Sequence, residues 1–140
     1  MWKIPPNDLA AEGAEEMSGE VEFIRLTDEN FKTEVLEHSG PVLVEFTKKA
    51  YGGHFIVATT MYEILRDYHD KIKITRLDVD QAVETAGRYR IHEIPTVLFF
   101  RAGVVVAYLI GIFRKRDILA KLQAVLEQDV KDTGSAAGHQ

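Results

Sequence analysis

One short run of apolar residues, Val42–Phe46, constrains the fold of this 140-residue chain more than any other feature. Glu45 is its single polar residue, and such a run is typical of a strand buried on both faces, as in a parallel sheet covered by helices. Residues Ile72–Val79 predict a second strand of this kind. Between the two, Gly52-Gly53 opens a predicted helix with apolar residues at Val57, Met61, Ile64, Leu65 and Tyr68. The sequence therefore predicts a central β-α-β unit.

After residue 95 the expected spacing of inward-facing residues changes to two, which is typical of strands. Thr96–Phe100 and Val104–Ile110, joined by Arg101-Ala102-Gly103, predict an antiparallel hairpin. An amphipathic helix is expected to follow over Asp117–Glu127. Before the central unit we expect a strand at Val21–Arg25 and a helix from Thr27 to His38, and after it a short helix over Gln81–Tyr89, capped by Asp80. This order predicts an α/β fold in which helices cover both faces of one mixed sheet.

The two ends differ in composition from the middle. Pro5-Pro6 and four glutamates predict a flexible acidic N-terminal extension over residues 1–20. We expect the folded domain at residues 21–128 and a disordered C-terminal tail at 129–140, which is small and polar. No signal-peptide pattern is found, so the sequence predicts a cytoplasmic protein.

Composition excludes several kinds of chemistry. The chain has no cysteine, so disulfides, thiolate metal ligands and thiol redox steps are absent. A net charge of −5 argues against nucleic-acid binding. The longest apolar run, Val104–Phe113, is too short for a bilayer span. We expect no cofactor and no membrane partner, and the oligomeric state stays open.

Five segments in order resemble the thioredoxin family: Pro41–Phe46, Leu77–Gln81, Arg90–Thr96, Phe99–Gly103 and Ile110–Ile112. The resemblance covers about Val21 to Glu127 and implies a thioredoxin-like fold, with a cis-proline at Pro95. Thioredoxins carry W-C-G-P-C at the start of the second helix, where this chain has Ala50-Tyr51-Gly52-Gly53-His54. Neither a phenol nor an imidazole exchanges with a disulfide, so we expect no thiol-disulfide oxidoreductase activity.

The resemblance also implies a surface that holds an extended peptide without using sulfur. By this resemblance it comprises Ala50, Tyr51, Gly52, Gly53, His54, Ile94, Pro95, Ile110, Gly111 and Ile112. The expected function is a redox-inactive protein-binding module of the chaperone or assembly-factor kind, with Tyr51 as anchor. In the opposing interpretation, Tyr51 and His54 merely fill the space that the cysteines left. A third interpretation keeps the chain in a thioredoxin pathway of redox homeostasis or disulfide metabolism.

Some charged side chains allow further interpretations. Glu45 lies in a core strand and should be paired, and the resemblance assigns Arg76 as its partner in an inherited buried ion pair. A more specific alternative is that Glu45 orients the His54 side chain or favours its protonated form. A metal or acid–base site at His54 with His92 and Glu93 is a weaker alternative because no metal-binding spacing is present, so we expect no metal. His38 and His69 are expected to face solvent.

Overall fold

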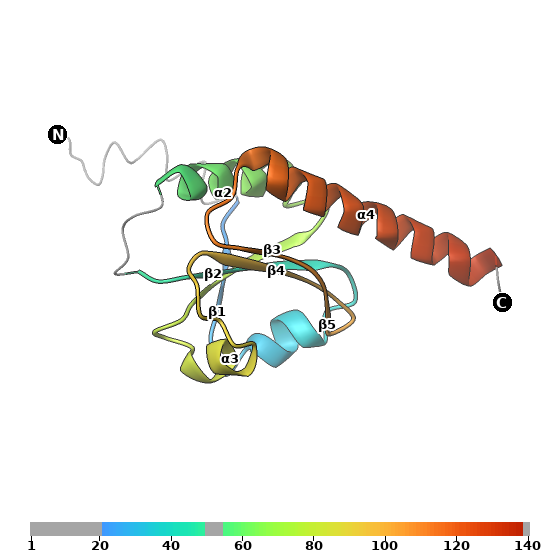
Figure 1. Cartoon of the computed structure of the whole chain (residues 1–140). Coiled ribbons are helices and arrows are strands. Elements are labelled where there is room, and N and C mark those ends of the chain that lie inside the picture. Colours follow the sequence, from blue (N-terminus) through green and yellow to red (C-terminus); the bar gives the residue numbers. More distant parts are fainter. Residues whose placement is uncertain (1–20, 50–54, 139–140) are drawn as a thin grey trace.

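The computed structural model of the chain describes residues 21–49 and 55–138 (Figure 1). The described elements follow the expected order of strands and helices. They are β1 (Ile24–Leu26), η1 (Lys32–Leu36), β2 (Val42–Thr47), α2 (Phe55–Tyr68), β3 (Lys73–Asp78), α3 (Val83–Arg88), β4 (Thr96–Arg101), β5 (Val104–Ile110) and α4 (Lys115–Gly138).

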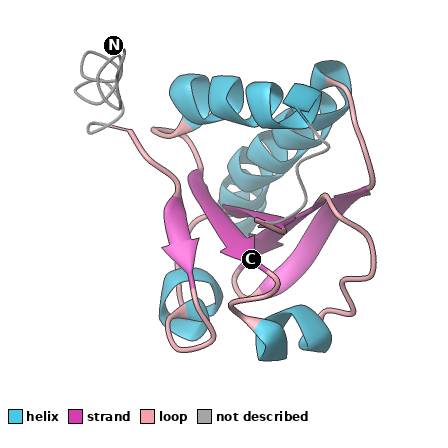
Figure 2. Cartoon of the chain, turned by 90° about the vertical axis from the view of Figure 1, so that its left-hand side faces the viewer, coloured by secondary structure: helices cyan, strands magenta, loops and turns pink. Residues whose placement is uncertain are grey.

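The five strands form one mixed sheet in the order β1-β3-β2-β4-β5. β1, β3 and β2 are parallel, whereas β4 runs antiparallel to β2 and β5 antiparallel to β4. The sheet lies between two layers of helices, with α2 and α4 on one face and η1 and α3 on the other (Figure 2). This arrangement confirms the expected α/β fold with helices on both faces.

β2 occupies the centre of the sheet and contributes to both hydrophobic cores. Leu43 packs among α2 and α4, where Met61, Ile64 and Leu122 are fully buried. The opposite side chains of β2 pack against η1 and α3, in a core that includes Phe31 and Phe100. Burial on both faces is the reason that the Val42–Phe46 run carries almost no polar residue.

Thr27 was expected to cap the first helix, but the N-cap of η1 is Phe31, and Thr27 opens the turn that precedes it. The Thr27 N–H donates to Oδ1 of Asn30 over 2.7 Å, and the Asn30 N–H donates back to Oγ1 of Thr27 over 3.0 Å. These reciprocal bonds satisfy two amide groups that a helix start leaves free. The helix then widens into a π-type turn, in which the Glu37 N–H donates to the Lys32 carbonyl over 2.9 Å. The regular helix expected up to His38 is therefore shorter and wider.

The cap of α3 is not Asp80, which corrects the expectation. The free N–H groups of Glu84 and Thr85 donate to the carboxylate of Asp28 over 3.3 and 2.8 Å, and the Thr85 hydroxyl donates to it over 2.7 Å. The hydrogen bond from the Thr85 side chain is the main reason that the pKa of Asp28 is lowered. Asp28 lies 56 residues before Glu84, so local sequence patterns could not reveal this cap.

The hairpin of β4 and β5 turns at Ala102 and Gly103, which both have positive φ angles of 53° and 80°. Two such residues match the right-handed twist of hairpin strands. A β-bulge in the same hairpin shifts the pairing register of β4 and β5 between Phe99 and Phe100. The predicted hairpin is confirmed, and the structure shows that β5 is an edge strand.

The last helix is longer than the sequence predicts. α4 covers Lys115–Gly138, past the helix end expected at Glu127 and into residues 129–138 of the expected C-terminal tail. No proline or glycine interrupts the chain between Lys115 and Gly134, and the small residues after Gly134 include alanine, a strong helix former. No helix in the described part of the chain combines the length and apolar content that crossing a bilayer requires.

Candidate functional site

The loop before β4 lies at the carboxyl end of β2. The peptide bond between Ile94 and Pro95 is cis, as the resemblance implies. Thr96, the next residue, pairs with Phe46 near the end of β2. The Pro95 carbonyl accepts the Gly111 N–H over 2.8 Å. This bond holds the proline loop against the end of β5, so two segments expected in the peptide-binding surface are neighbours.

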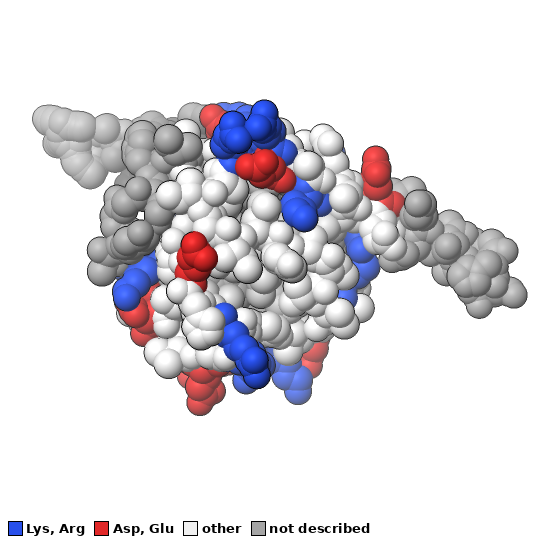
Figure 3. All heavy atoms as spheres, in the orientation of Figure 1, with Lys and Arg blue, Asp and Glu red and all other residues white. Residues whose placement is uncertain are grey.

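An exposed apolar surface lies beside this loop. Tyr108, Ile110 and Ile112 are 57%, 59% and 68% exposed, and we call these three residues the docking patch. Figure 3 shows few charged side chains on the face over β4 and β5, with Lys and Arg gathered where α4 begins. The sequence analysis did not include Tyr108, because β5 reads VVVAYLI with no polar residue to mark its exposed face. The alternation of exposure along β5 becomes visible only in the structure.

Gly111 and Ile94 shape the edge of the docking patch. Gly111 has a φ of +87°, and a Cβ added there would lie 3.1 Å from Oε2 of Glu93. Glycine is therefore required at this bend. Ile94 is half-buried and packs against the core under η1 and α3. No described residue forms a hydrogen bond with its backbone N–H or C=O.

The other half of the expected surface lies outside the described residues. Ala50, Tyr51, Gly52, Gly53 and His54 all fall between Lys49 and Phe55, so the roles expected for Tyr51 and His54 remain predictions. The same holds for the idea that Glu45 acts on His54.

Glu45 and Arg76 form the ion pair that the sequence analysis expects. Nε and Nη2 of Arg76 each lie 2.9 Å from Oε1 of Glu45, and Glu45 is 4% exposed. Burial raises the pKa of the Glu45 carboxyl, and the charge of Arg76 opposes this rise. The Arg76 guanidinium also stacks on Phe23, 3.8 Å from its ring centre, with Tyr62 at 5.6 Å. The Glu45 carboxylate is thus held by Arg76, whose own position is fixed by its stacking on Phe23.

Metal-ligating side chains are scattered in the described part of the chain. No three residues among its His, Asp and Glu come together in a way that could hold a metal ion. His92 and Glu93 are both exposed, and the third residue of the suggested site, His54, lies outside the described residues.

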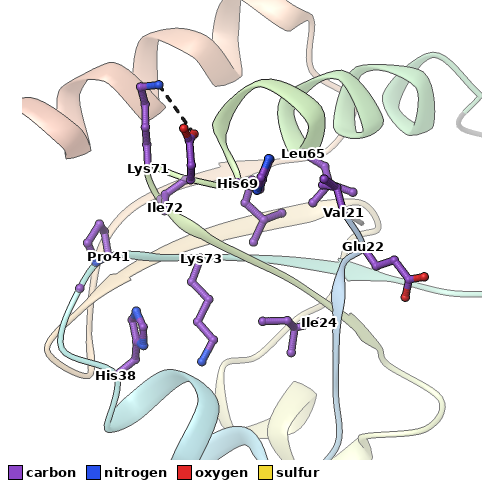
Figure 4. Close-up of a pocket in the computed structure, with 13 residues that line it drawn as sticks. Val21, Glu22, Ile24, His38, Pro41, Leu65, His69, Lys71, Ile72 and Lys73 are labelled. Carbon is purple, nitrogen blue, oxygen red and sulfur yellow. Dashed lines mark ion pairs between the residues drawn. The ribbon is translucent and has the colours of Figure 1, made fainter. Parts of the chain in front are cut away.

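A cavity of about 440 Å³ lies at the other end of the parallel strands (Figure 4). Its lining includes His38, His69 and Lys73. His38 was expected to face solvent, but it is half-buried, and burial followed by the charge of Lys73 lowers its pKa. Lys73 is itself paired with Glu34 over 2.7 Å. Because Glu34 already neutralises Lys73, the cavity has little net positive charge from this residue with which to bind an anionic ligand.

Comparisons with known proteins agree with this geometry. A family model described as Thioredoxin matches residues 22–124. A thioredoxin of Pseudomonas aeruginosa is 34% identical over 102 residues, which cover 73% of this chain and 94% of that protein. Thioredoxin C-2 of Corynebacterium nephridii is 35% identical over 108 residues, or 77% of this chain and 96% of that protein. A thioredoxin of Buchnera aphidicola is 36% identical over 109 residues, or 78% and 97%. The chain therefore belongs to the thioredoxin family, although it contains no cysteine.

Proposed function

We propose that this protein is a non-catalytic binding module that holds an extended segment of another polypeptide, as a chaperone or assembly factor does. Disulfide exchange needs a thiolate to attack sulfur, and this chain supplies none. Loss of the thiol step leaves the peptide-holding surface of the fold as the part that can still act.

The observation that carries the proposal is the docking patch beside the Ile94–Pro95 loop. Three large side chains, those of Tyr108, Ile110 and Ile112, are each more than half exposed within five residues. Exposed apolar side chains gathered in one patch are often functional in soluble proteins. Tyr108 and Ile110 lie two residues apart on one strand and so share a face of the sheet. Alternate side chains of an extended segment could contact them.

The backbone of Ile94 supports the same mode of binding. Its N–H and C=O have no hydrogen-bond partner among the described residues, whereas the next carbonyl, of Pro95, is occupied by Gly111. A free donor and a free acceptor on one residue can pair with the backbone of an added strand. Affinity would come from these two bonds and from apolar contact with the docking patch.

The test uses a fluorescent insulin B chain with carbamidomethylated thiols as an extended, apolar probe. Binding is measured by fluorescence anisotropy for the wild type, for Ile112→Glu, and for Val83→Glu. Val83 is 65% exposed but lies on α3, outside the docking patch, so it controls for an added charge. We expect Ile112→Glu to weaken binding about tenfold or more, and Val83→Glu to leave it unchanged. Absence of binding by the wild type, or equal losses in both variants, would overturn the proposal.

A further inference from the structure

A cavity of about 620 Å³ lies at the carboxyl ends of the three parallel strands. It is lined by Arg25, Leu26, Thr27, Thr47, Lys48, Lys49, Arg76, Asp78 and Gln81. The chain leaves β2 for α2 on one face of the sheet and leaves β3 for α3 on the other face. Ligands of parallel sheets bind in the crevice that such a divergence opens. The cavity therefore occupies the position in the sheet that most favours a small-molecule site.

Positive charge is concentrated around this cavity in a chain whose net charge is −5. Among the described residues that line the cavity, four are cations and one, Asp78, is an acid. Arg25 and Arg76 lie directly opposite each other in the register of β1 and β3. Like charges in this position repel each other. Glu45 neutralises Arg76, but no described carboxylate pairs with Arg25, Lys48 or Lys49.

Arg76 presents a rigid guanidinium at the wall of the cavity. Glu45 holds two of its nitrogens, and the Phe23 ring lies 3.8 Å from its central carbon. The third nitrogen, Nη1, has no carboxylate partner among the described residues. A donor that is already ordered loses little entropy when it binds a ligand. The hydroxyls of Thr27 and Thr47 and the amide of Gln81 add neutral donors to the same wall.

We propose that this cavity binds a small organic phosphate through Arg25, Lys48, Lys49 and Arg76. Guanidinium and ammonium groups suit the oxygens of phosphate, and several cations favour a ligand with more than one negative charge. The volume lies within the range of small-molecule sites and exceeds what a single phosphate group fills. This site goes beyond the proposed function because it uses neither the docking patch nor the Ile94–Pro95 loop.

The experiment is a calorimetric titration of the full chain with inorganic pyrophosphate at fixed ionic strength, with citrate as the carboxylate counterpart. Lys48→Gln/Lys49→Gln removes two cations from the cavity. The matched control, Arg114→Gln/Arg116→Gln, removes two cations from the start of α4. Both pairs are exposed, and circular dichroism verifies that each variant is folded. Arg25→Gln repeats the test from the β1 side.

We expect the wild type and the Arg114/Arg116 control to bind pyrophosphate equally, and the Lys48/Lys49 variant to bind it about tenfold more weakly. Citrate should bind more weakly than pyrophosphate. No binding by the wild type would overturn the proposal. Equal weakening in both double variants would also overturn it, because it would show general attraction to positive charge. Tighter binding of citrate would refute the assignment to phosphate.

Discussion

Replacing Arg76 with methionine removes the partner of a buried carboxylate and keeps much of the apolar stem. In the wild type, two nitrogens of Arg76 lie 2.9 Å from one oxygen of Glu45, and Glu45 is almost entirely buried. Removing one member of a buried pair costs about 3–5 kcal/mol. Because the Arg76 side chain is 21% exposed, we expect a loss near the lower limit, about 3 kcal/mol at pH 7.

The loss should depend on pH in a defined direction. The pKa of Glu45 is raised in the folded protein, so just above the reference value of 4.5 the folded chain keeps a proton that the unfolded chain loses. Stability from this group therefore falls as the pH rises through the folded pKa. Without Arg76 the folded pKa rises further, and the wild type and the variant diverge as the pH increases. Below pH 4.5 the carboxyl is neutral in both, and about 1 kcal/mol should remain from the lost stacking on Phe23.

Urea unfolding followed by far-UV circular dichroism, at pH values on both sides of 4.5, measures these differences. Glu45→Gln and the double variant complete a double-mutant cycle that isolates the interaction of the pair. In the Glu45→Gln background, Arg76→Met should cost no more than the stacking contribution. An equal loss at low and high pH in the wild-type background would refute the electrostatic reasoning.

Three further predictions concern other parts of the molecule. Asp28→Ala should lower the melting temperature at neutral pH, and this difference should vanish in strong acid, because the lowered pKa of Asp28 means that its contribution is lost as the pH falls below 3.8. Gly111→Ala should cost about 1–2 kcal/mol in urea unfolding because of its positive φ and the nearby Glu93 oxygen, whereas Gly87→Ala, with open space around it, should be neutral or stabilising. Turbidity of insulin in dithiothreitol should develop at the same rate with and without the protein, and acceleration would contradict a non-catalytic role.

The sequence was sufficient for elements whose pattern depends on local chain geometry. The apolar run of β2 follows from burial on two faces, and the antiparallel hairpin of β4 and β5 is confirmed. Exposure alternates along β5 but not along β4, which is buried on both faces from Thr96 to Phe100. The turn that Thr27 opens before η1 is also local, since its partner Asn30 lies three residues away.

Features that depend on distant residues could not be predicted in this way. Asp28 caps α3 from 56 residues earlier in the chain, and the facing of Arg25 and Arg76 exists only once β1 and β3 pair. The cavity lined by Lys48 and Lys49 needs three strand ends to converge. The expected peptide-binding surface is implied by resemblance to a family, and Tyr108 is added to it only because the structure exposes this side chain.

The central claim is that the surface beside the Ile94–Pro95 loop holds an extended polypeptide. Titration of the ¹⁵N-labelled protein with the thiol-blocked insulin B chain, followed by amide chemical shifts, tests this claim residue by residue. We predict the largest shift changes at Ile94, Tyr108, Gly111 and Ile112, with little change at Val83 on α3. Unchanged shifts at these four residues, or larger changes elsewhere on the domain, would contradict it.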